Sequence, residues 1–253
     1  AGPVEPDDDR VLPLHEVLAA GLVQPGGRAL ALMVPINNTT MARELCAWLP
    51  EVSHCTTLKI PRGKGLLTAD TIPAYQQGAY ELAQQLAGKP LDVLAYGCTA
   101  ASFLAGPAMD REMQQRLADS LNLPVVTTAQ SMVKELQALG IGRVALVTPY
   151  QDEVNDRLKR YLLEEGIEVR AFDSLRAPDV DALGRITADE VAAMAKQVMT
   201  DDCEAMFIAC SQLPTFDILD SLSQQFQRPV LSSIQATAAQ ARRVFTSLSR
   251  SHS

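Results

Sequence analysis

The chain has 253 residues, of which 47% are hydrophobic and 21% charged, a composition typical of a globular protein with a substantial buried core. Its formal net charge of −8 argues against a nucleic-acid partner, because proteins that bind a phosphate backbone usually carry a basic stripe. The longest apolar runs have the length of strands and the N-terminus is acidic, so neither a membrane partner nor a secretory signal is expected.

Apolar runs of strand length alternate with amphipathic helical patterns along the chain. The predicted strands cover residues 28–34, 55–60, 91–96, 123–128, 143–148, 167–172, 204–209 and 229–233. The predicted helices cover residues 39–49, 71–88, 109–121, 129–139, 151–165, 187–200, 215–226 and 234–248. Short apolar strands separated by helices predict parallel sheets with crossover helices, and therefore an α/β fold.

Three segments of the first half return in the same order in the second half. RALALMVP (28–35) resembles RVALVTPY (143–150), LDVLAYGCT (91–99) resembles CEAMFIACS (203–211), and NLPVVTTAQ (122–130) resembles QRPVLSSIQ (227–235). Ordered repeats indicate duplicated structural units. We therefore predict two pseudo-symmetric Rossmann-like parallel-sheet domains with the active site in the cleft between them. The predicted boundaries are an N-terminal arm at 1–27, a first half at 28–127 plus 234–253, and a second half at 128–233.

The five cysteines are Cys46, Cys55, Cys98, Cys203 and Cys210. Their number is odd and no CxxC pair occurs, which argues against a disulfide framework and a structural metal site. Free thiols are typical of a reducing compartment, so we expect a cytoplasmic location. Cys46 lies in a predicted helix beside Trp48 and is expected in the core. Cys55 and Cys203 are expected to have structural roles.

Cys98 and Cys210 occupy equivalent positions of the repeat, each just after a predicted strand. Ligands of open parallel sheets bind beyond the carboxyl ends of strands, and a pseudo-twofold axis would bring these two ends to one cleft. Two facing thiols can act on one small carboxylic acid, one by adding to it and the other by transferring a proton. The hydroxyls and amides of Thr99 and Ser211 can hold a carboxylate. For either cysteine alone, the simpler alternative is a small buried hydrophobe.

Further candidate ligands follow the first strand of each half. Asn38, within PINNTT (35–40), can bind a carboxylate, although a role as helix N-cap explains it equally well. Tyr150 ends the matching strand and can donate its hydroxyl into the cleft, or it can serve as an aromatic interface residue. The loop PRGKG (61–65) is either a mobile lid or a turn.

Four motifs carry a resemblance to a known family. MVPINNTTMARE, YGCTAASF, ALVTPYQDEVN and ACSQLPT resemble the maleate cis-trans isomerase and arylmalonate decarboxylase branch of the Asp/Glu racemase superfamily, in the same order, over about residues 28–240. The resemblance implies two pseudo-symmetric domains, no metal, no organic cofactor and a homo-oligomer. It implies that Cys98 adds to the double bond of a small acid and that Cys210 transfers the proton. Asn38 and Tyr150 match substrate-binding positions of the family.

Two departures from the family pattern bear on the reaction. Val180 stands where the isomerases carry an asparagine, which resembles the decarboxylases and leaves room for an apolar substrate group. The decarboxylases, however, have glycine where this chain has Cys98. The paired thiols favour maleate-type cis-trans isomerisation through a covalent cysteine adduct. A racemase or a malonate-type decarboxylase is the alternative, and a non-catalytic carboxylate-binding protein is a third, less favoured one.

Overall fold

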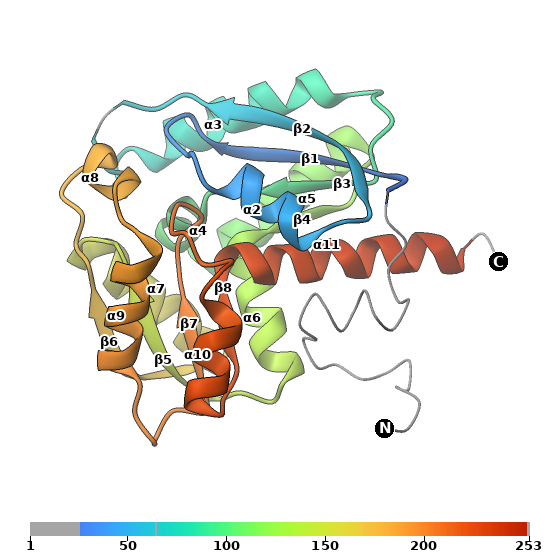
Figure 1. Cartoon of the computed structure of the whole chain (residues 1–253). Helices are drawn as coiled ribbons and strands as arrows, with labels where there is room; N and C mark the ends of the chain where they lie inside the picture. Colours follow the sequence, from blue (N-terminus) through green and yellow to red (C-terminus); the bar gives the residue numbers. More distant parts are fainter. Residues whose placement is uncertain (1–25, 64, 252–253) are drawn as a thin grey trace.

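Two four-stranded parallel sheets form the framework of the computed structural model, which describes residues 26–63 and 65–251 (Figure 1). The first sheet has the order β2-β1-β3-β4 and contains β1 (Arg28–Pro35), β2 (Val52–Ile60), β3 (Val93–Tyr96) and β4 (Val125–Thr127). The second has the order β6-β5-β7-β8 and contains β5 (Arg143–Thr148), β6 (Glu168–Ser174), β7 (Ala205–Ile208) and β8 (Val230–Ser232). The identical orders confirm the predicted pseudo-symmetric α/β fold.

Helices cover the sheets, as expected where every strand pairs in parallel and the central strands are buried. They are α2 (Met41–Trp48), α3 (Ile72–Ala83), α4 (Thr99–Ala105), α5 (Pro107–Leu121), α6 (Thr128–Ala138), α7 (Asp152–Glu164), α8 (Val180–Gly184), α9 (Ala188–Val198), α10 (Leu219–Phe226) and α11 (Ser233–Arg250), with a 3-10 turn η1 (Gln84–Leu86). The long helix α11 starts at β8 and packs against α2, β3 and β4 of the first sheet (Figure 1).

The repeat extends to the helix caps. The side chain of Thr127 accepts a hydrogen bond from the backbone N–H of Gln130 at the start of α6. The side chain of Ser232 does the same with Gln235 at the start of α11. Each cap satisfies a backbone donor that the helix itself leaves free, so both halves turn from their last strand into a helix in the same way.

Several predicted boundaries differ from the structure. The short helices α4 and α8 were not expected, and β2 begins at Val52, three residues before the predicted strand, because it pairs with Arg28 of β1. Helix α10 begins at Leu219 rather than at 215. The predicted arm at 1–27 lies outside the described residues as far as residue 25, so its boundary stays a prediction, as does the division into 28–127 plus 234–253 and 128–233.

The expectation that Cys46 lies in the core is wrong, because this side chain is exposed. The buried face of α2 consists of Met41, Glu44, Leu45 and Trp48. With 3.6 residues per turn, position 46 falls on the opposite side of the helix.

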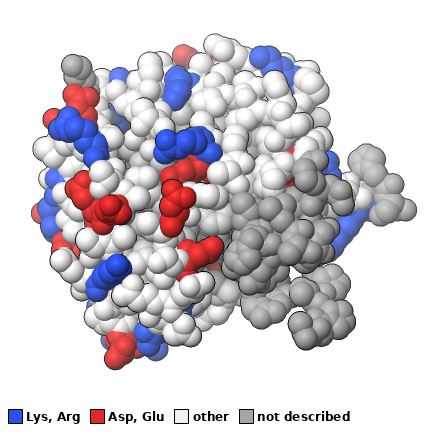
Figure 2. Space-filling view, viewed as in Figure 1, with Lys and Arg blue, Asp and Glu red and all other residues white. Residues whose placement is uncertain are grey.

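The surface visible in Figure 2 carries Lys, Arg, Asp and Glu side chains interspersed over the described residues, and no continuous basic stripe is seen on this face. Within residues 26–63 and 65–251, no helix has the length and apolar character needed to cross a membrane.

A buried carboxylate outside the pocket residues also ties the two halves together, next to the end of β4. Asp110 of α5 is fully buried and accepts hydrogen bonds from Ser102 (2.6 Å), Thr127 (3.0 Å), Gln130 (3.3 Å) and the Tyr161 hydroxyl (3.0 Å). Burial raises the pKa of Asp110, whereas these donors lower it. Because Tyr161 belongs to α7 of the second half, its bond to Asp110 crosses between the halves.

Removing the Tyr161 hydroxyl should therefore destabilise the protein. A hydrogen bond to a buried charged group contributes about 1.5–3 kcal/mol, so we expect Tyr161→Phe to lower the free energy of unfolding by about that amount in urea denaturation. Tyr80→Phe is the control, since Tyr80 is only half-buried and its ring still packs against Arg116. A change below about 0.5 kcal/mol for Tyr161→Phe would contradict the prediction.

Candidate active site

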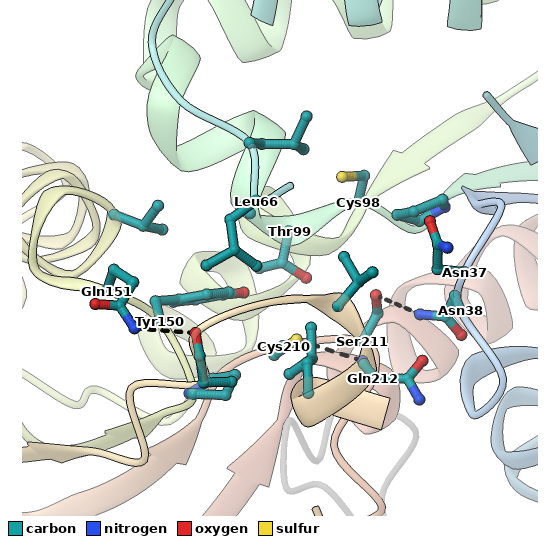
Figure 3. Close-up of a pocket in the computed structure, with 18 of the residues that line it drawn as sticks. Asn37, Asn38, Leu66, Cys98, Thr99, Tyr150, Gln151, Cys210, Ser211 and Gln212 are labelled. Atoms are coloured by element: carbon teal, nitrogen blue, oxygen red, sulfur yellow. Dashed lines mark hydrogen bonds between the residues drawn. The ribbon is translucent and has the colours of Figure 1, made fainter. Parts of the chain in front are cut away.

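The carboxyl ends of the central strands of both sheets meet at a pocket between the halves (Figure 3). Its cavity is about 170 Å³, the size needed for a small organic acid. All the residues proposed from the sequence to act in catalysis or binding line it: Cys98, Cys210, Asn38, Tyr150, Thr99, Ser211 and Val180. The fold therefore brings together residues that are up to 173 positions apart in the chain, while their individual roles stay predictions.

The position of Cys98 depends on the residue before it, Gly97, whose backbone packs closely against Met33 and Met41. Gly97 donates its backbone N–H to the carbonyl of Met33 at 2.7 Å. A Cβ atom on Gly97 would lie 2.6 Å from the Met41 sulfur and 2.8 Å from the Met33 carbonyl oxygen. Only glycine fits there without a shift of its neighbours, so the chain can leave β3 and present Cys98 at the start of α4.

The Cys98 thiol is 2% exposed, and burial raises its pKa above that of an ordinary thiol. Three groups act in the opposite direction and lower this pKa: the Tyr75 hydroxyl, the backbone N–H of Ala101 and the positive charge of Arg62. A thiol must lose its proton to become a nucleophile. The surroundings of Cys98 therefore contain the groups that would stabilise its thiolate.

Cys210 lies in an unusual backbone conformation, with φ of 122°, which L-residues rarely adopt. Its N–H donates to the Ser233 hydroxyl at 3.0 Å, and its sulfur accepts from the N–H of Gln212 at 3.4 Å (Figure 3). Burial raises the pKa of Cys210 to about 11, and the nearby Cys98 contributes in the same direction, whereas Gln212 and Tyr150 lower it. Both thiols line the same pocket, and with a pKa of about 11 Cys210 holds its proton at neutral pH.

Two buried hydroxyls in the pocket have no conventional hydrogen-bond partner among the described residues. They belong to Tyr150 and Thr99, and Figure 3 shows the Tyr150 hydroxyl directed towards Thr99. The pKa of Tyr150 is raised by burial and by Cys210 and Cys98. Burying a hydroxyl without a partner is unfavourable, so these groups are suited to donate to a bound carboxylate.

Asn38 and Ser211 join the two halves at the pocket. The Asn38 amide oxygen accepts from the N–H groups of Thr40 (3.1 Å) and Met41 (3.0 Å), which cap α2, and its amide nitrogen donates to the Ser211 hydroxyl at 3.1 Å (Figure 3). That hydroxyl donates to the Gly97 carbonyl at 2.8 Å. The N-cap residue of α2 is Thr40, but the Asn38 side chain binds the first backbone N–H groups of the helix and also lines the pocket, so the capping and pocket interpretations are compatible.

Glu44 and Gln212 strengthen this contact. The buried carboxylate of Glu44 accepts from the backbone N–H groups of Thr215 and Phe216, at 3.1 Å and 3.0 Å. The Gln212 amide accepts from the backbone of Thr39 at 2.8 Å and donates to its hydroxyl at 2.7 Å. The segment after β7 is therefore held in a non-helical form by the first half, which explains why α10 begins only at Leu219.

One wall of the pocket is apolar. It is formed by Val180, as the sequence suggested, together with Leu66, Leu67, Val154, Ala177 and Leu183. Within the described residues, no group of three or more His, Cys, Asp or Glu side chains is arranged to hold a metal ion.

Sequence reasoning missed three residues at the site. No role was predicted for any of them. Arg62 belonged to the loop PRGKG, Tyr75 to a predicted helix, and Gln212 to the motif ACSQLPT. The arginine in a glycine-containing loop directly after a predicted strand was a usable signal for Arg62. Nothing in the local sequence pointed to Tyr75, because its contact with Cys98 depends on how α3 packs.

Comparisons with known proteins agree with this geometry. The chain is 27% identical to the maleate isomerase of Geobacillus stearothermophilus over 82% of this chain and 88% of that protein. It is also 27% identical to the arylmalonate decarboxylase of Bordetella bronchiseptica, over 69% of this chain and 73% of that protein. The structure of Nocardia farcinica maleate cis-trans isomerase shares the fold, with a TM-score of 0.80, 24% identity, and coverage of 87% of this chain and 93% of that one.

A sequence model of arylmalonate decarboxylase matches residues 62–252, about three quarters of the chain. The match includes both pocket cysteines, Tyr150 and Val180, and it confirms the resemblance seen in the motifs. The chain therefore belongs to the arylmalonate decarboxylase family.

Proposed function

We propose that the protein is a cofactor-independent isomerase that converts a small unsaturated dicarboxylic acid of the maleate type from cis to trans. The observation that carries this proposal is the presence of two buried thiols that line one pocket, together with two buried hydroxyls that have no hydrogen-bond partner among the described residues. The similarity of the chain to a maleate isomerase over 82% of its length supports the same reaction.

The proposed reaction begins with attack of the Cys98 thiolate on one alkene carbon, which forms a C–S bond. The π electrons move to the second carbon, which takes the proton from the Cys210 thiol. The former double bond is now single and can rotate. Cys210 then removes a proton from the second carbon, the double bond re-forms in the trans geometry, and the C–S bond to Cys98 breaks. Atoms and electrons balance over this cycle, and both thiols return to their starting state.

The unpaired hydroxyls of Tyr150 and Thr99 would bind a substrate carboxylate in this scheme. Negative charge grows on that carboxylate as the thiolate adds, and hydrogen-bond donors already in place stabilise it without reorganisation. The Asn38 amide and the Ser211 backbone lie on the other side of the pocket and would complete the carboxylate contacts.

Decarboxylation of a substituted malonate is the second candidate. The apolar wall around Val180 favours it, because this wall would accept an apolar substituent better than a second carboxylate. A racemase would use the same two thiols for proton transfer alone, and a binding protein would use the pocket without either step.

We also propose a cytoplasmic location, since the mechanism needs reduced thiols, and a homo-oligomeric state, which rests on the resemblance to the family. Light scattering of the purified chain tests the second point.

Replacing either pocket thiol should abolish isomerisation. We expect Cys98→Ser and Cys210→Ser each to lower kcat/KM for maleate by about a thousandfold or more, measured by the appearance of fumarate in NMR spectra. Cys203→Ser is the matched control, since Cys203 is buried outside the pocket.

Other outcomes would select the alternatives. Release of carbon dioxide from an arylmalonate that survives Cys98→Ala and disappears in Cys210→Ala would establish decarboxylation. Solvent deuterium exchange without alkene isomerisation would establish racemisation. If all three assays give nothing and neither thiol reacts faster than a free thiol, the protein binds its ligand without converting it.

The two thiols should also shape the pH dependence. Cys98 must be deprotonated to attack, and burial raises its pKa, so kcat/KM should increase as the pH rises from 7 into the alkaline range. Cys210 must carry a proton, so the rate should fall as the pH approaches its pKa of about 11. A profile that is flat or declines between pH 7 and pH 9 would exclude this assignment. Circular dichroism at each pH checks that the fold is intact.

A further inference from the structure

Arg62 lines the pocket, and the proposed mechanism gives it no contact with the substrate. It follows β2 in the loop that leads to α3 and lines the pocket together with Cys98. Among the described residues that line this pocket, Arg62 and Glu153 carry a full charge, and Glu153 is exposed. Arg62 is therefore the only positive charge that the described lining offers to an anionic ligand.

The guanidinium of Arg62 is only partly satisfied by the protein. One terminal nitrogen donates to the Gly65 carbonyl at 2.7 Å, which fixes the side chain against its own loop. The Nε atom is buried and has no hydrogen-bond partner in the described structure, and no ion pair with a described residue involves Arg62. A buried donor on a charged group without an acceptor is costly, and a carboxylate is the ligand whose geometry matches it.

The position of Arg62 relative to Cys98 suggests which carboxylate it would take. Arg62 and Cys98 line the same pocket, and the charge of Arg62 acts to lower the pKa of the Cys98 thiol. The hydroxyls of Thr99 and Tyr150 line this pocket too, and they come from the segments that follow β3 and β5. The pocket therefore holds two separate groups that can each bind a carboxylate beside Cys98.

We propose that Arg62 binds a second carboxylate of the substrate beside Cys98, so that the pocket selects dicarboxylates over monocarboxylates. The inference rests on the proposed function for the reaction that follows, but the binding step can be tested without turnover.

The test compares two alkylating reagents at Cys98. Iodoacetate and iodoacetamide transfer the same carbon to sulfur with loss of iodide, and they differ in that the first carries a carboxylate. The rate of labelling is measured for each reagent by mass spectrometry of the peptide that contains Cys98. The ratio of the two rates isolates carboxylate binding, because any change in the thiolate fraction of Cys98 affects both reagents equally.

We expect the iodoacetate-to-iodoacetamide ratio at Cys98 to exceed that of a free thiol, and Arg62→Gln to lower it about tenfold or more, the effect of losing one charge-assisted contact. Arg62→Lys should retain part of the preference. Arg160→Gln removes the same charge from an exposed site on α7 outside the pocket and should leave the ratio unchanged. An unchanged ratio in Arg62→Gln, an equal loss in Arg160→Gln, or a Cys98 that neither reagent labels would overturn the proposal.

A second measurement uses the unaltered protein and does not depend on the folding of a variant. Succinate should protect Cys98 from iodoacetamide at concentrations about tenfold lower than butyrate, which has the same carbon chain and one carboxylate fewer. Equal protection by both would refute the inference. If the preference for carboxylates is found and maleate is not isomerised, the proposed reaction fails and the role of Arg62 stands. If maleate is isomerised and the preference is not found, the role of Arg62 fails and the proposed reaction stands.

Discussion

The contact between the Asn38 amide and the Ser211 hydroxyl is the constraint on which the site depends. Asn38 is fixed by capping α2, and Ser211 is fixed by its bond to the Gly97 carbonyl. These bonds connect the residue before Cys98 with the residue after Cys210. The hydrogen bonds of Glu44 with Thr215 and of Gln212 with Thr39 add to this contact between the halves. The position of one thiol relative to the other is thus decided by polar contacts between the halves, and not by either half alone.

Burial in the pocket helps one of the two thiols in its proposed role and hinders the other. Exclusion of water raises the pKa values of both, which favours the proton donor role of Cys210 and opposes the nucleophilic role of Cys98. The surroundings differ accordingly: Cys98 has the Tyr75 hydroxyl and the Arg62 charge beside it. Two thiols can take different roles when their surroundings differ in this way, here Cys98 as the nucleophile and Cys210 as the acid. The strained backbone of Cys210 is a further sign that its placement serves the site.

Members of one family can catalyse different reactions on this framework, because the framework supplies the cleft and the side chains supply the chemistry. The presence of Cys98 supports addition to a double bond, whereas the apolar wall around Val180 would suit a substituted malonate. The Arg62 guanidinium in the same pocket changes the balance. It adds a cationic group to a lining that is otherwise largely apolar, and this combination fits an unsaturated dicarboxylate, including one with a small apolar substituent.

The amino-acid sequence by itself determined the two-sheet architecture, since the repeat places equivalent strands in equivalent order and apolar runs of strand length bury on both faces. It also identified Cys98, Cys210 and Tyr150, because residues just after parallel strands converge at one edge. Only the tertiary structure revealed Arg62 and Tyr75 as neighbours of Cys98, and only it showed Cys46 to be exposed and Asn38 to be both cap and pocket residue. The physical reason is that periodicity encodes which face of an element is buried, whereas contacts between loops and helices of different halves depend on packing that no local pattern carries.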